Sequence, residues 1–357
     1  MSALLRSDGP HPGRRTGAVG LVALVVLLIA GLFAPSTILH GWLIAFVNVC
    51  GIALGCTAWR AIHALTGGRW GEVGTSGLRA GSTLMPLTVV LVLPPLFAAR
   101  WLYPWAADAH SVPSDVHGFY LNGWSVGLRS LALLGGLSFV AWRNRQSTLS
   151  PLIAALTLLL YGGLMNLSAF DWLLSLDPRY TSSAIGMQII VAQLLAGLCF
   201  LVLVTDAPEG DRVWGDFGAL LLACLLGELY LLFMTFVVHW YGDLPDQAAW
   251  YLLRTQGVWH WLVIVGTALC ALAPALALLF TAVRTSRSRL RTLAALILFG
   301  LLLEYIWLVA PQAGAEAGWA IAAALAANLT IGALALAVLE IWRARAGFVE
   351  GGSVAHG

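Results

Sequence analysis

The chain has 357 residues, of which 60% are hydrophobic and 10% are charged, and its mean hydropathy is +0.86. Soluble domains carry about a quarter charged residues, so this composition excludes a water-soluble fold. The net charge is only +2, and every basic side chain other than histidine is an arginine, since the sequence contains no lysine. So small a charge, without a basic tract, gives no electrostatic basis for binding nucleic acid.

Ten apolar stretches are long enough to form membrane-spanning helices. A bilayer core of about 30 Å requires about 20 apolar residues in a helix, and only helices or closed barrels satisfy their backbone hydrogen bonds there. The sequence therefore predicts an all-α polytopic membrane protein, with a transmembrane domain at residues 18–342 between tails at 1–17 and 343–357. The first run has no small-residue cleavage site after it, so we expect an uncleaved span rather than a signal peptide. The predicted spans are residues 18–39, 41–65, 83–104, 122–142, 151–175, 184–205, 217–240, 258–283, 291–311 and 319–342.

The connections between these spans are short, so no extramembrane domain is expected. The longest are the Gly-rich stretch at residues 66–82 and the stretches at 105–121 and 242–257. Pro94 and Pro95 lie inside the third span and should kink it, because proline has no backbone N–H to donate. No second prolyl break of this kind is expected.

The arginines indicate the orientation, because cytoplasmic loops near a membrane collect positive charge. With the N-terminus inside, the outer segments hold only Arg100, Arg179 and Arg254. Both termini are therefore expected in the cytoplasm, and the number of spans should be even. The fifteen arginines of the inner segments are Arg6, Arg14, Arg15, Arg60, Arg69, Arg79, Arg143, Arg145, Arg212, Arg284, Arg287, Arg289, Arg291, Arg343 and Arg345.

The five cysteines lie inside apolar stretches and have neither CxxC nor cluster-ligand spacing. We interpret them as small packing residues and expect no metal, iron–sulfur cluster or haem in this chain. His239 and His260 are expected at nearly the same outer depth, which does not match the paired histidines that ligate b-type haems.

Four ionisable residues fall at depths where a charge costs about 2.5–3.5 kcal/mol on insertion scales. Glu228 lies near the middle of the seventh span, Glu304 past the middle of the ninth, Arg129 in the fourth and Asp171 at the end of the fifth. Arg129 and Asp171 could pair to hold two helices together, or could shape the mouth of a proton path. The two glutamates could be structural, or could relay protons, with Tyr161 extending the hydrogen-bonded chain.

The predicted orientation gathers polar and aromatic side chains under the outer surface. A quinol headgroup needs hydrogen-bond partners for two ring oxygens, a group that takes protons and an apolar slot for its tail. Histidines and aromatic residues at a membrane interface also serve simply as anchors. The outer set comprises Arg129, Asp171, Asp177, Arg179, His239, Tyr241, His260, Trp307 and, more deeply, Glu304.

Three blocks carry a family resemblance. The segment AFDWLLSLDPRY contains Phe170, Asp171, Trp172, Ser175, Leu176, Asp177 and Pro178, and Ser182, Ser183 and Gly186 follow it. The segment HWYGDLPDQAAWYLLRTQGVWHW contains Trp240, Tyr241, Pro245, Trp250, Tyr251, Arg254, Gly257 and Trp259, and EYIWLVAP contains Glu304, Trp307, Val309 and Pro311. In this order, over residues 169–311, the blocks resemble the second polysulfide-reductase-like (NrfD-like) membrane subunit of alternative complex III, a bacterial quinol:electron-acceptor oxidoreductase.

The resemblance implies ten spans with both ends cytoplasmic, in a bacterial inner membrane. It also implies a subunit without its own redox centre, beside a sister membrane subunit and partner subunits that carry iron–sulfur clusters and several haems. This chain would supply proton-path residues, a second quinone site and contact surface. The sequence leaves two other classes open: a secondary transporter with Glu228 and Glu304 at a midplane site, and a scaffolding subunit.

Overall fold

The computed structural model describes residues 12–354, with side chains placed for residues 15–344. Most of the predicted N-terminal tail lies outside these residues, whereas the predicted C-terminal tail continues α17 as far as residue 354. The side chains of Arg6, Arg14 and Arg345 lie outside the described residues. The described chain is built of helices, and residues 12–354 include no β-strand. The predicted all-α class is confirmed.

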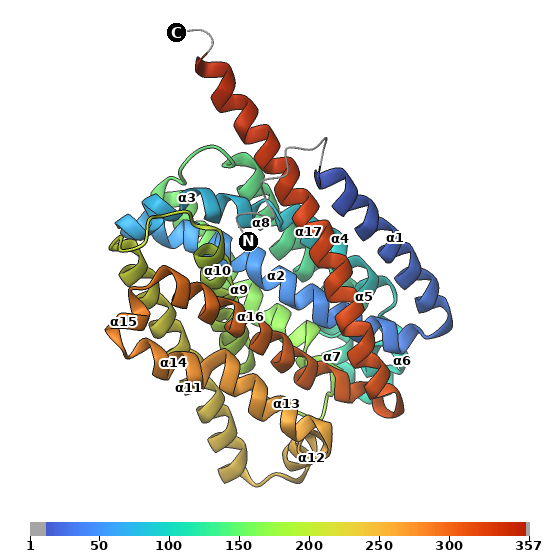
Figure 1. Ribbon diagram of the computed structural model, residues 1–357. Coiled ribbons are helices and arrows are strands. Elements are labelled where there is room, and N and C mark those ends of the chain that lie inside the picture. The colour runs from blue at the N-terminus through green and yellow to red at the C-terminus, as the bar shows by residue number, and fades with distance from the viewer. Residues whose placement is uncertain (1–11, 355–357) are drawn as a thin grey trace.

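Nine stretches of the described chain are long and apolar enough to cross a membrane. The last, Arg287–Ala344, consists of two helices, α16 (Arg287–Val309) and α17 (Ala317–Val354). They are joined by the short helix η6 (Ala310–Glu316), in which Gly314 has φ 61° and the chain turns back (Figure 1). The other eight stretches are Arg15–Phe33, Pro35–Thr66, Arg69–Phe97, Gly123–Arg143, Pro151–Leu176, Ile185–Val204, Val213–Gly242 and Val258–Leu278.

Helix α2 (Pro35–Thr66) forms the centre of the bundle. It packs against α9 (Pro151–Trp172), α10 (Ile185–Val204), α16 and α17, and almost all its residues from Thr37 to Ala61 are buried. Helices α2 and α10 cross closely because Gly55 faces Gly197, and a Cβ at Gly55 would overlap the carbonyl oxygen of Gln193. Small residues at such a crossing let two membrane helices pack backbone to backbone.

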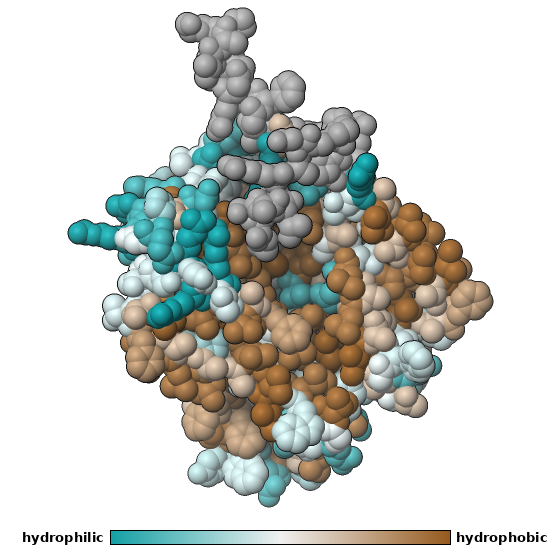
Figure 2. Space-filling view, in the orientation of Figure 1, coloured by the Kyte–Doolittle hydropathy of each residue, from teal (hydrophilic) through white to brown (hydrophobic). Residues whose placement is uncertain are grey.

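The outer helices expose apolar faces around this centre. Helix α1 (Pro12–Phe33) packs mainly against α2 and α17. Leu32 and Phe33 on its outward face are exposed. Outward apolar side chains also cover α8 (Gly123–Arg143), α11 (Val213–Gly242) and α13 (Val258–Thr267). The face seen in Figure 2 carries a broad hydrophobic band, with hydrophilic residues gathered at the upper left and at the lower edge. A band of this kind suits a hydrocarbon environment.

The connections gather at two opposite ends of the bundle. At one end, which we call the arginine end, Arg69 is paired with Asp211 at 3.0 Å and Arg287 with Asp206 at 2.7 Å. Figure 1 shows α1 beginning and α17 ending toward this side. The opposite end carries the connection at residues 177–184 and α12 (Pro245–Arg254).

Two predicted boundaries were wrong, whereas the predicted connection at 242–257 lies between α11 and α13 as expected. The break after the first helix lies at Ala34, because Pro35 starts α2; the predicted break near residue 40 falls inside that helix. Residues 66–82 are not a loop: α3 (Arg69–Ser82) fills most of this stretch, and its glycines allow close packing, since Gly77 faces Leu201 and Gly81 faces Cys56. The stretch at 242–257 contains α12. Only residues 105–121 form a connection of short pieces, α6 (Pro104–Ala107), η3 (Ala109–Ser111) and α7 (Ser114–Phe119).

Two transmembrane stretches are interrupted. The third breaks between α4 (Met85–Leu91) and α5 (Leu93–Phe97), as Pro94 and Pro95 predict, and continues into η2 (Ala99–Trp101). The eighth stretch contains an interruption that the sequence analysis did not expect: the π-helical turn η5 (Ala268–Leu272), followed by α14 (Ala273–Leu278) and α15 (Thr281–Arg284). Pro274 has no N–H for the carbonyl of Cys270, so the regular helix cannot continue there.

Candidate functional site

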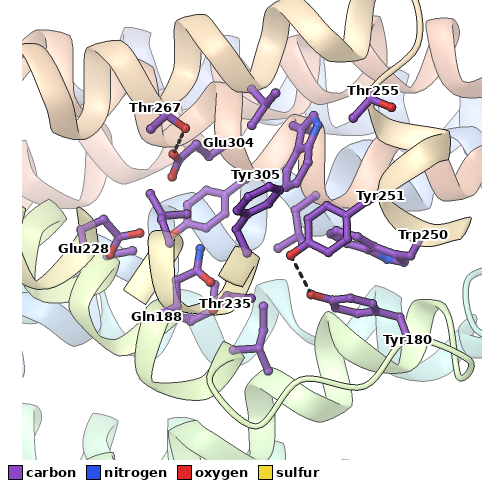
Figure 3. A pocket seen from close by; sticks show the side chains of 18 residues that line it. Tyr180, Gln188, Glu228, Thr235, Trp250, Tyr251, Thr255, Thr267, Glu304 and Tyr305 are labelled. Carbon is purple, nitrogen blue, oxygen red and sulfur yellow. Dashed lines mark hydrogen bonds between the residues drawn. The ribbon is translucent and has the colours of Figure 1, made fainter. Parts of the chain in front are cut away.

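A cavity of about 290 Å³ lies among α10, α11, α12, α13 and α16, on the side of the bundle away from the arginine end. Its inner end holds Glu228 and Glu304, and its outer end is closed by Tyr180, Trp250 and Tyr251 (Figure 3). Aliphatic side chains form much of the wall between them, from Ile185, Ile189, Ala192, Leu232, Val263 and Leu308. The cavity is therefore a mainly apolar slot with polar groups concentrated at its two ends.

Glu228 lies halfway along α11 and is 1% exposed. Neither carboxyl oxygen has a hydrogen-bond partner among the described residues. A carboxyl in such surroundings must be neutral, paired or in contact with water or a ligand, because an isolated buried charge is prohibitively costly. Glu228 lines the cavity, so a partner bound there could reach it.

Glu304 projects from α16 into the same cavity. Its Oε1 accepts a hydrogen bond of 3.2 Å from the hydroxyl of Thr267, the last residue of α13 (Figure 3). Gly266, next to Thr267, packs against the Glu304 side chain. Glu228, from α11, lines the same cavity. Two helices far apart in sequence therefore bring two carboxyl groups to one chamber.

Further buried polar atoms without partners line this chamber. The hydroxyls of Thr235 and Tyr305 make no hydrogen bond to any described residue, and both face the cavity together with Glu228. The amide of Gln188 also lines it. Buried polar groups in folded proteins almost always have partners, so a cluster of unpaired ones indicates a place for water or a polar ligand.

An aromatic cluster forms the outer wall. The ring of Tyr180 is stacked between Trp250, at 4.0 Å, and His239, at 4.9 Å, and its hydroxyl lies 3.4 Å from that of Tyr251. Trp307 meets Trp250 edge to face at 5.5 Å. The rings come from the 177–184 connection, α11, α12 and α16, so their contacts hold these elements together at the closed outer end of the cavity.

Arg254 lies behind this cluster and was assigned no site role from the sequence. It is 1% exposed, places its guanidinium 3.7 Å from the centre of the Trp250 ring and donates to the Leu308 carbonyl at 2.9 Å. The indole N–H of Trp307 donates to the Arg254 carbonyl at 3.1 Å. Burial lowers the pKa of Arg254 to about 9, so the side chain is still mostly cationic at neutral pH. The sequence feature that could have indicated a role for Arg254 is its position in a run of aromatic residues just before an apolar span.

The side of the slot between α11 and α13 faces outward. Helix α11 packs closely against η5 and α14, but not against α13. Leu232 and Phe236 of α11 and Val263 of α13 line the cavity, and Phe236 is 49% exposed. The slot therefore has an apolar opening on the hydrophobic band of the protein surface.

Arg129 and Asp171 lie together, away from this cavity. The guanidinium forms two hydrogen bonds with the carboxylate, of 2.7 and 2.8 Å, and also donates to the Tyr120 carbonyl at 2.8 Å. Asp171 is fully buried, and neither residue lines the cavity. The pair joins α8 to α9, as expected if Arg129 and Asp171 hold two helices together rather than shape a proton path.

Tyr161 also lies apart from the cavity. Its hydroxyl donates to Gln193 at 2.8 Å, and the Gln193 amide contacts the Met165 sulfur at 3.3 Å. These groups bridge α9 and α10 in the core. Tyr161 therefore has a hydrogen-bond partner of its own, and among the described residues no hydrogen bond links it to either glutamate.

The remaining predicted outer residues divide into two groups. Asp177 is paired with Arg179 at 3.1 Å and lies near the base of the aromatic cluster; burial tends to raise the pKa of Asp177, but hydrogen bonds from Arg179 and Gln312 outweigh burial and leave this pKa lowered. The two ring nitrogens of His239 lie within hydrogen-bond distance of carbonyl oxygens, Nδ1 at 2.6 Å from Thr235 and Nε2 at 3.0 Å from Thr181. Tyr241, 83% exposed, and His260, which lies against Trp261, project from the protein surface and do not line the cavity.

Neither a scan against protein-family models nor a search of curated proteins finds a match to the chain. Among the residues that the structure describes, no three His, Cys, Asp or Glu side chains are grouped as metal ligands would be. The cavity and its carboxyls are thus the strongest guide to function.

Proposed function

We propose that the chain is an integral membrane subunit of a respiratory quinol:electron-acceptor oxidoreductase in a bacterial inner membrane, crossing the bilayer ten times with both termini in the cytoplasm. The cavity would take a quinone or quinol headgroup, and Glu304 and Glu228 would exchange protons with it. The observation that carries this proposal is one apolar slot that opens on the hydrophobic band and ends on two carboxyl groups.

The slot suits the chemistry of a quinol. Aromatic and aliphatic walls accommodate a flat ring and a prenyl tail, while hydroxyls and carboxyls at the inner end can bond the ring oxygens. Oxidation of a quinol releases two protons and two electrons. Glu304 and Glu228 would receive the protons, and the electrons would pass to iron–sulfur and haem centres in partner subunits, beside a sister NrfD-like membrane subunit.

The test is replacement of each glutamate by its amide. Glu228→Gln and Glu304→Gln keep side-chain volume but cannot exchange a proton, so the assembled complex should form while quinol oxidation, or the ratio of protons to electrons, falls by well over twofold. Glu316→Gln is the matched control, because Glu316 is exposed, accepts a hydrogen bond from Thr37 and lies outside the cavity. It should retain both properties.

Binding is measured separately from turnover. A photoreactive quinone analogue should label the wild-type chain at cavity residues such as Phe236 or Tyr251, and excess unlabelled quinone should suppress the labelling. If both glutamine variants keep full turnover and coupling and no label enters the cavity, the chain is a scaffolding subunit and the proposal is wrong.

One observation favours a second candidate, a secondary transporter. The third and eighth transmembrane stretches are both interrupted, and η5 adjoins Thr267 and Glu304. Transporters build midplane sites from broken helices in this way. Uptake of a solute or ion by liposomes containing the chain alone, abolished by Glu304→Gln, would support this candidate over the first.

A further inference from the structure

A second cavity, of about 250 Å³, lies at the arginine end of the bundle. It is formed by the last turns of α2, by α3 and by the connection between α8 and α9. Its polar lining is composed of Arg60, His63, Thr75, Arg79, Ser147 and Thr148. We refer to it as the basic pocket.

Two guanidinium groups face this pocket without an acidic partner. Arg60 is only 9% exposed and donates from Nη2 to the carbonyl of Asn144 at 2.7 Å. Arg79 is partly buried, and its guanidinium has no hydrogen bond or ion pair to any residue within 15–344. The two positive charges act on each other through the pocket. A buried pair of like charges is unfavourable unless an anion lies between them.

Three other arginines at this end have hydrogen-bond partners outside the pocket. Arg69 and Arg287 pair with aspartates, and Arg291 donates to the carbonyl of Thr205 at 2.7 Å. The basic pocket has no Asp or Glu in its lining. The pocket therefore encloses two arginine side chains and offers neither of them a carboxylate.

The remaining polar groups of the pocket can complete an anion shell. The ring Nε2 of His63 lies 3.1 Å from the carbonyl of Gly68, and the ring is fixed edge to face against Trp70 at 5.3 Å. Ser147 and Thr148 are exposed at the pocket rim, where their hydroxyls can donate to a bound oxygen. Arginine and hydroxyl donors together match the several oxygens of a phosphate group.

One wall of the pocket is apolar. Ala64 and Leu149 line it and belong to a small hydrophobic cluster with Val140, Ile153 and Leu158, which joins the ends of α2, α8 and α9. The same site thus offers charge for a headgroup and an adjoining hydrophobic surface, at the end of the bundle where the apolar band stops. A free anion cannot bury apolar atoms on that surface, whereas a lipid can pack its glycerol and first acyl carbons there.

We propose that the basic pocket binds the phosphate group of an anionic phospholipid headgroup, held between Arg60 and Arg79. Basic pockets between membrane helices at the cytoplasmic surface favour such lipids. The bound lipid would neutralise the two arginines and link α2, α3 and the α8–α9 connection. This site is separate from the quinone cavity and does not depend on the function assigned to that cavity.

The experiment uses the full-length protein, purified in mild detergent and stripped of lipid. Its thermal unfolding is followed while phosphatidylglycerol, phosphatidylcholine or inorganic phosphate is titrated in, and co-purifying lipids are counted by mass spectrometry. Phosphatidylglycerol should raise the unfolding temperature, and millimolar phosphate and phosphatidylcholine should do so far less. Arg79→Gln should weaken the phosphatidylglycerol effect at least tenfold, because it removes a charge-assisted contact to phosphate. Arg145→Gln, an equal change of charge at an exposed neighbour outside the pocket, should alter it less than twofold.

Arg60→Gln serves as a second variant, since its loss of lipid should match that of Arg79→Gln if the protein folds. Equal responses of Arg79→Gln and Arg145→Gln would overturn the proposal and leave the pocket for an acidic side chain of a partner subunit. An effect of inorganic phosphate equal to that of phosphatidylglycerol would also overturn it, in favour of a free phosphate ion.

Discussion

The buried charged side chains of this protein differ in the partners that offset the cost of their burial. Arg129 and Asp171 satisfy each other with two short hydrogen bonds, Arg254 relies on carbonyls and the Trp250 ring, and Glu228 has no partner among the described residues. Compensated charges within a protein interior usually hold it together, whereas uncompensated ones require an occupant. The same criterion separates a structural pair from the two candidate ligand sites.

Asp171→Asn should strongly destabilise the protein. It leaves the guanidinium of Arg129, whose side chain is 15% exposed, without its counter-charge, and breaking such a buried pair costs about 3–5 kcal/mol. Thermal or denaturant unfolding in detergent would measure the loss. Arg69→Gln breaks the exposed pair with Asp211 and should cost less than about 1 kcal/mol. Similar losses in the two variants would show that the Arg129 pair is not structural.

Some residues of the candidate site could be predicted from the sequence, and others could not, for a physical reason. Glu228 and Glu304 were evident because a carboxyl in an apolar run is costly wherever its helix points. Tyr180, Tyr251 and Arg254 were assigned no role in the site, because their role depends on which rings stack across elements. Tyr161 and Asp171 were assigned to the proton path on depth alone, and depth does not specify the side of a helix to which they point.

At the scale of elements, close helix contacts depend on glycine. Gly55 and Gly197 let α2 and α10 approach, and Gly300 of α16 packs against the backbone of Cys270 in η5. The helices are apolar on all sides, so their sequences contain no amphipathic stripe that would reveal the contact face. For this reason the lengths of the spans could be predicted, but the pairing of helices and the π-helical turn could not.

Gly55→Ala should disrupt the crossing of α2 and α10, since the added methyl group would overlap the Gln193 carbonyl. Overpacking of this kind costs about 1–3 kcal/mol, and more where backbone must move. Gly163→Ala on α9 is the control, because a Cβ there has no atom within 4 Å. It should be neutral or stabilising by up to about 1 kcal/mol. Monodispersity on size exclusion and the unfolding temperature would report both, and an unaffected Gly55→Ala protein would contradict the close crossing.

At the scale of the whole molecule, most arginines lie in every second connection along the sequence, and the structure brings these connections together at one end of the bundle. Arg60, Arg69, Arg79 and Arg287 come from separate connections or helix ends, yet all lie at the arginine end. From the positive-inside rule we expect that end to face the cytoplasm. Composition and the spacing of arginines were sufficient for this level of organisation, because neither depends on the rotation of any helix.

The orientation predicts which engineered cysteines react. In intact cells a membrane-impermeant maleimide should not label Ser288→Cys, at the arginine end, but should label Ser183→Cys, at the opposite end; both positions are exposed. The native cysteines give little background, since four are buried and Cys224 is partly buried. Labelling of Ser288→Cys without lysis, with Ser183→Cys protected, would reverse the orientation.

The lateral opening between α11 and α13 affects how any affinity for the cavity must be measured. A ligand that enters through this side is dissolved in the hydrocarbon phase, so the concentration that governs its occupancy is moles per volume of lipid rather than of water. Enlarging the micelle or vesicle volume dilutes such a ligand even when the total amount is constant. An apparent dissociation constant for the slot should therefore rise in proportion to the amount of detergent, whereas that of a site open to water should not.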